Sequence, residues 1–131
     1  MTREELFAYA KATYGVEPDY PWMDLPEACV LRHKDSRKWF GLVMIISERH
    51  LGKSALQPSE GRPPEDRPIV ALDVKADPAF ISMSVGKGGF YRAYHMNKEH
   101  WVTLHLGEAS DDAVKMALDE SFVLTEGKKK K

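Results

Sequence analysis

The run WFGLVMII, from Trp39 to Ile46, constrains the fold of this chain more than any other segment. All eight of its residues are apolar, and successive side chains of a β-strand point to opposite faces of the sheet. The run therefore predicts a central strand that is covered on both faces, or a sheet with helices packed against it. A transmembrane helix takes about 20 apolar residues, so we expect no membrane span here.

Shorter patterns predict the other strands. The stretch KDSR favours a turn, and it joins the strands predicted at Ala28–His33 and Lys38–Ile46 into a hairpin. Ile69–Lys75 alternates between two faces and indicates a third strand. His100–Leu106 indicates a fourth strand, in which Val102, Leu104 and Leu106 form one aliphatic face.

Capping signals predict three helices. Thr2 and Glu5 fit a capping box that starts a helix ending at Tyr14. Asp77 can cap a short helix, and Ser110 starts the last one. Because strands and helices do not alternate regularly, we expect an α+β fold: an antiparallel sheet of about four strands with helices mainly on one face.

Length and charge bound the class of protein. The 131 residues suit one domain, which we place at residues 1–127, with 128–131 as a flexible lysine tail. The net charge is −1, and removing the four tail lysines leaves −1 − 4 = −5. A protein that grips phosphates over its whole surface should be basic, so any nucleic-acid contact must use a local patch. Without a targeting segment, we expect a cytoplasmic protein.

Metal, thiol and enzyme chemistry find little support in the sequence. The single cysteine, Cys29, lies in an apolar strand and is predicted to be a buried hydrophobe. His100 and His105 are five positions apart, and this odd spacing would send them to opposite faces if both lay on one strand. We therefore predict no metal site, no cofactor and no catalytic residue.

The stretch YHMNKEHWVTL, Tyr94–Leu104, is the candidate binding region. Trp101 falls on the face opposite the aliphatic one, so either a helix covers it or it belongs to a binding surface. Cations beside aromatic side chains are the combination that contacts phosphates and stacks bases.

Several separated motifs resemble the MmcQ/YjbR family of small bacterial proteins. They are AYHMNKEHWVTL, REELFAYAKATYG followed by EPDYPW, VLRHKDSRKWFGLVM, DVKADP and ESFVLT. The resemblance implies a CyaY-like (frataxin-like) fold and a double-wing DNA-binding arrangement. The positions that match the family's motifs are Arg32, His33, Lys38, Trp39, Asn97, Lys98, His100 and Trp101. This chain departs from the family in its longer loop QPSEGRPPEDRP and in the segment LHLGEAS.

Two functions follow as hypotheses. The first is a non-enzymatic DNA-binding module whose partner is duplex DNA. Its candidate contacts are Arg32, Arg37, Lys38, Arg92 and Lys98. The second is a module for a protein or a small anionic ligand, using Asn97, Lys98, His100 and Trp101. A third possibility, acid–base catalysis by His100, lacks any nucleophile at a recognisable spacing. We expect a monomer or a weak dimer.

Overall fold

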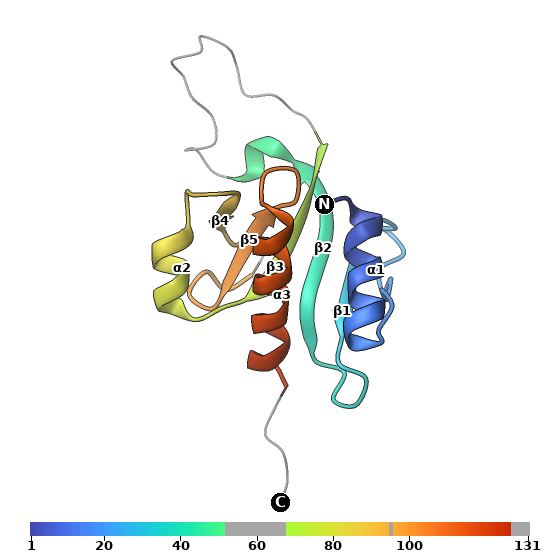
Figure 1. Cartoon of the computed structure of the whole chain (residues 1–131). Helices are drawn as coiled ribbons and strands as arrows, with labels where there is room; N and C mark the ends of the chain where they lie inside the picture. The colour runs from blue at the N-terminus through green and yellow to red at the C-terminus, as the bar shows by residue number, and fades with distance from the viewer. Residues whose placement is uncertain (52–67, 95, 127–131) are drawn as a thin grey trace, which may run out of the picture.

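The chain forms one antiparallel sheet with helices along one face (Figure 1). The computed structural model describes residues 1–51, 68–94 and 96–126. The elements in chain order are α1 (Arg3–Tyr14), β1 (Cys29–Arg32), β2 (Trp39–Ser47), the 3₁₀ helix η1 (Glu48–Leu51), β3 (Pro68–Lys75), α2 (Pro78–Ser84), β4 (Phe90–Arg92), β5 (Trp101–His105) and α3 (Asp111–Leu124). The strand order across the sheet is β1-β2-β3-β5-β4. The predicted α+β class is confirmed.

Side chains at the helix starts explain where the helices begin. The Thr2 hydroxyl accepts the Glu5 N–H at 3.1 Å, and the Glu5 carboxylate accepts the Thr2 N–H at 2.8 Å, so the predicted capping box is present. Asp77 caps α2 and Ser110 caps α3, each through its side-chain oxygen. The predicted starts of all three helices are therefore confirmed.

The main core lies between the sheet and the three helices. Leu6 and Ala10 of α1, Ile81 of α2 and Leu118 of α3 belong to one buried cluster with residues from the strands. Ser121 fixes α3 to the sheet, because its hydroxyl donates to the Phe40 carbonyl at 2.7 Å and accepts the Lys75 N–H at 2.9 Å. The helices therefore pack on one face of the sheet, as the sequence predicts.

The opposite face of the sheet carries a smaller hydrophobic cluster, which also receives side chains from the loop after α1 and from the segment after β4. Val30, Leu42 and Met44 are buried there. Trp22, from the proline-rich loop after α1, packs edge-on against Trp39 with ring centroids 5.7 Å apart. Because β2 contributes to both clusters, its prediction as a central strand covered on both faces is confirmed.

The sheet has one more strand than the sequence pattern indicates. The prediction of about four strands is wrong, because β4 pairs with β5 as a fifth strand. β4 has only three residues and follows the glycines of GKGG, so no local alternation marks it. Likewise, the polar loop predicted after Ser47 begins as η1. The rest of that loop and the lysine tail lie outside the described residues.

Cys29 is buried without a disulfide partner, as predicted. Burial raises the pKa of its thiol above the usual value, which disfavours the reactive thiolate. Among the described residues, no helix is both long and apolar enough to span a bilayer.

Candidate functional site

Most of the predicted site residues lie at one end of the sheet. The strand register pairs Arg32 with Trp39, Lys75 with Trp101 and Arg92 with Val102. The turn at 33–38 and the turn at 97–100 therefore lie at the same end, which we call the Lys75 end. The Ala76 N–H donates to the His100 carbonyl at 2.9 Å and holds the second turn against β3.

The three cationic side chains of the β1–β2 hairpin differ in whether they pair with the Asp19 carboxylate. Arg32 donates through Nε to the Asp19 carboxylate at 2.7 Å, and its guanidinium lies 5.9 Å from the centre of the Trp39 ring. Arg37 Nη2 is 3.9 Å from the same carboxylate. Lys38 is exposed. Asp19 therefore offsets the charge of Arg32 and, at longer range, that of Arg37.

Arg92 and Lys98 come together in one open cavity. The cavity has a volume of about 420 Å³ and is also lined by Ser82 and Glu99. Both cations are exposed, and neither side chain forms a hydrogen bond or ion pair with the described part of the chain. Two exposed cations with a nearby hydroxyl suit an anionic group.

The four residues of the predicted ligand surface do not share one environment. Asn97 accepts the Glu99 N–H through Oδ1 at 2.8 Å, so its side chain closes the turn. Lys98 and His100 are exposed, and Trp101 is half-buried at the start of β5. The helices share a core cluster with Val102 and Leu104, whereas strand alternation puts Trp101 on the other face of β5.

Asp73 is a buried carboxyl group that sequence reasoning missed. It is 0% exposed and accepts a hydrogen bond from the Thr103 hydroxyl, and among the described residues its Oδ2 atom has no hydrogen-bond partner. Burial raises its pKa to about 7, against the opposing effects of the Thr103 hydrogen bond and the Lys98 charge. Thr103 also accepts the Tyr94 N–H at 3.0 Å, so this pair anchors the segment that leads to Asn97. The signal in the sequence is an acid inside an apolar strand.

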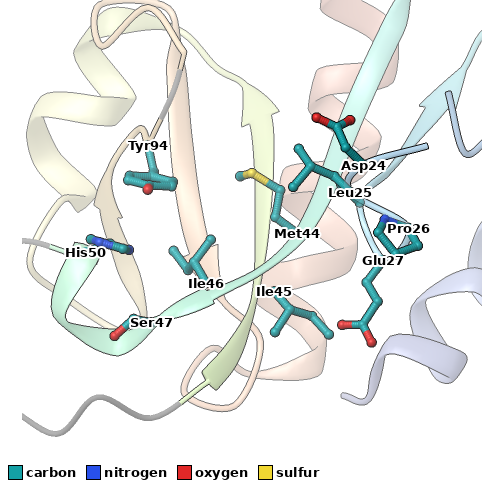
Figure 2. A pocket seen from close by; sticks show the side chains of 11 residues that line it. Asp24, Leu25, Pro26, Glu27, Met44, Ile45, Ile46, Ser47, His50 and Tyr94 are labelled. Atoms are coloured by element: carbon teal, nitrogen blue, oxygen red, sulfur yellow. The ribbon is translucent and has the colours of Figure 1, made fainter. Parts of the chain in front are cut away.

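A groove lies on the face of the sheet away from the helices (Figure 2). Its volume is about 440 Å³. Met44 and Ile46 contribute to its wall from β2, His50 and Tyr94 stack with ring centroids 5.0 Å apart, and Asp24 lies across from them on the loop before β1. Its apolar wall and acidic rim suit an apolar ligand better than a phosphate.

His100 and His105 are separated, but not by strand alternation as predicted, because β5 begins only at Trp101. His100 is exposed in the turn before β5, whereas His105 is buried at the far end of that strand. His95 lies outside the described residues. One group among the described residues, Glu48 with His105 and Glu108, has the donor atoms and proximity to hold a metal ion. Sequence reasoning did not consider it, because its members are far apart in the chain.

These features define a small α+β domain with a cation-bearing end and an apolar groove. The sequence model of the YjbR family matches residues 11–124. The chain is 32% identical over 126 residues to "Uncharacterized protein YyaQ" of Bacillus subtilis, covering 95% of this chain and 98% of that protein. The chain therefore belongs to the YjbR family.

Solved structures agree on the fold. A crystal structure of a protein from Pseudomonas syringae superposes with a TM-score of 0.84 at 33% identity, covering 95% of this chain and 99% of that one. The Deinococcus radiodurans protein DR2400, with a DUF419 domain, superposes with a TM-score of 0.65 at 20% identity, covering 97% of this chain and 80% of that one. At 20% identity the second comparison supports the fold alone.

Proposed function

We propose that this domain is a non-enzymatic cytoplasmic module that binds duplex DNA with the Lys75 end of its sheet. The wings are the β1–β2 hairpin and the β4–β5 hairpin, in the CyaY-like, double-wing arrangement that the family resemblance implies. The observation that carries the proposal is the pairing of Arg92 and Lys98 in one open cavity at the same end as Arg37 and Lys38.

The dimensions of the sheet fit this proposal. β1 and β4 are the two edge strands, four strand intervals apart. At about 4.8 Å per interval, these two edge strands are about 19 Å apart, a span comparable to the width of a DNA duplex. The negative charge of the body opposes binding elsewhere on the surface, so the contacts are confined to this end.

The salt dependence of binding tests the proposal. We expect the chain with Lys128–Lys131 replaced by glutamine to bind a 16-base-pair fluorescent duplex by anisotropy. With about four phosphate contacts, affinity should fall about a hundredfold between 50 and 200 mM salt. The variant Arg92→Gln/Lys98→Gln should reduce the slope of log affinity against log salt by about two.

The control is Lys87→Gln. This residue is exposed in the turn before β4, at the other end of that strand, so it loses a charge outside the proposed interface. Absence of duplex binding by the tail-neutralised chain at 20 mM salt would refute the proposal, as would equal slopes for the control and the double variant.

The alternative function is binding of a small anionic ligand in the same cavity. It is supported by the same two cations and by Ser82, which lines the cavity with them. Inorganic phosphate, titrated beside the duplex and followed by amide NMR shifts of Arg92 and Lys98, separates the two functions. Shifts at millimolar phosphate without duplex binding would favour the small ligand.

A further inference from the structure

Three side chains from different parts of the chain meet at the end of the sheet opposite the Lys75 end. Glu48 begins η1, His105 ends β5, and Glu108 lies in the turn before α3. Their nearest donor atoms all lie within 4.8 Å of one another, and His105 Nε2 is 3.9 Å from Glu48 Oε2. Two carboxylates thus share a small space with one imidazole nitrogen.

The histidine supplies a second, independent observation. His105 is 6% exposed, and its Nε2 is buried without a hydrogen-bond partner among the described residues. Its Nδ1 accepts the Gly107 N–H at 3.1 Å, so the ring is held with Nε2 facing Glu48. A buried nitrogen left without a hydrogen bond is unusual and calls for an explanation.

A further side chain orients the cluster. The Tyr91 hydroxyl donates to Oε1 of Glu108, and within the described part of the chain nothing hydrogen-bonds to Oε2 of that carboxylate. Burial, and then the nearby carboxylates of Glu108 and Glu48, raise the pKa of Tyr91 above its usual value. Tyr91 is therefore a neutral hydrogen-bond donor that positions a carboxylate, as partners outside a ligand set commonly do.

We infer that Glu48, His105 and Glu108 form a binding site for a divalent transition-metal cation, of which Mn²⁺ and Zn²⁺ are suitable probes. One imidazole nitrogen and two carboxylates are a donor set that both ions accept. Metal–ligand bonds of about 2.0–2.2 Å require the three groups to draw closer than they are here. Glu108, which is exposed, has the freedom to make that adjustment, and water completes the coordination.

Binding of the cation would break the hydrogen bond between the Gly107 N–H and His105 Nδ1. A cation on Nε2 displaces the proton there, and the neutral ring then carries its proton on Nδ1. Nδ1 can no longer accept the Gly107 N–H, so the turn at 106–108 must move away. The Gly107 amide is therefore a local reporter of metal binding, and the cost of the lost hydrogen bond limits the affinity.

The test uses the full, tag-free chain. Titration with MnCl₂ should broaden the amide NMR signals of Glu48, Gly107 and Glu108 before any others. ZnCl₂ should bind with 1:1 stoichiometry by calorimetry and shift the Gly107 amide. Glu108→Gln, at an exposed position, should weaken Zn²⁺ binding at least tenfold. His105→Gln should abolish it.

The control is His100→Gln, which removes an exposed histidine at the other end of β5 and should leave the affinity unchanged. The inference is overturned if Mn²⁺ broadening is spread over many surface carboxylates, or if Glu108→Gln binds Zn²⁺ like the unmodified chain. It is also overturned if Zn²⁺ binding leaves the Gly107 amide unmoved. The site lies away from the proposed DNA interface, so failure of either proposal leaves the other standing.

Discussion

Replacing Asp73 with asparagine should stabilise the protein at pH 8 and have little or the opposite effect at pH 5. The folded-state pKa of Asp73 is raised to about 7, whereas an unfolded aspartate titrates near 3.9. The folded state therefore favours the neutral carboxyl. The contribution of this group to stability is fully present below about pH 3.9 and is lost as the pH rises through 7. Three pKa units correspond to about 4 kcal/mol at pH 8.

Asparagine removes this ionisation cost but introduces another. Its carbonyl can still accept the Thr103 hydroxyl, whereas its amide group takes the place of the unpartnered Oδ2. An unsatisfied buried donor costs about 1–3 kcal/mol. We therefore expect Asp73→Asn to gain about 2 kcal/mol in the free energy of unfolding at pH 8, measured by urea denaturation.

Asp77→Asn is the matched control for this prediction. Asp77 is exposed and caps α2, and asparagine caps a helix about as well as aspartate. The same change of side chain should therefore show little dependence on pH. A loss of stability in Asp73→Asn that is equal at pH 5 and pH 8 would contradict the raised pKa.

Replacing Gly89 with alanine should destabilise the fold by about 3 kcal/mol or more. Gly89 has a φ of +89°, and a Cβ there would lie 2.7 Å from the Ala109 nitrogen and 2.9 Å from its Cα. A left-handed conformation costs a non-glycine residue about 1–2 kcal/mol. Overpacking against backbone adds about 1–3 kcal/mol, because backbone cannot move aside as a flexible side chain can.

Gly86→Ala separates these two costs. Gly86 has the same φ of +89°, but a Cβ there would meet nothing within 4 Å. It should therefore show the conformational cost alone, about 1–2 kcal/mol, in the same urea denaturation measurements. Equal losses for the two variants would show that the approach of Ala109 has no energetic importance.

Gly89→Ala should also disturb the proposed metal site. The Gly89 carbonyl accepts the His105 N–H at 2.9 Å, and the Ala109 N–H donates to the His105 carbonyl at 2.9 Å. Displacing Ala109 therefore disturbs the turn that carries Gly107 and Glu108. A variant that stays folded should also bind Zn²⁺ more weakly.

The elements that the sequence predicted correctly are those with local signals. Thr2, Asp77 and Ser110 cap their helices with neighbouring residues, so a few consecutive letters contain both partners of each interaction. β4 was not predicted, because three residues are too few to show hydrophobic alternation. Its hydrogen bonds come from β5, which a local pattern does not reveal.

The candidate site also combines features that the sequence indicates with features that only the structure reveals. Arg92 and Lys98 are close in the chain, and the structure brings them into one cavity. Arg32 has the residue type for a phosphate contact, but its ion pair with Asp19 cannot be read from the sequence. The predicted placement of His100 and His105 on opposite faces of one strand does not apply, because His100 precedes β5. The neighbours of His105, Glu48 and Glu108, come from two other segments.

By itself, the sequence determined the α+β class, the central position of β2, the helix starts and the family. These depend on periodicity, on capping and on the order of motifs, all of which are properties of neighbouring residues. Only the tertiary structure decided the fifth strand, the burial of Asp73, the pairing of Arg92 with Lys98 in a cavity and the cluster around His105. Those features depend on which distant residues approach each other and on how much water is excluded between them, because charge and proton affinity respond to that environment.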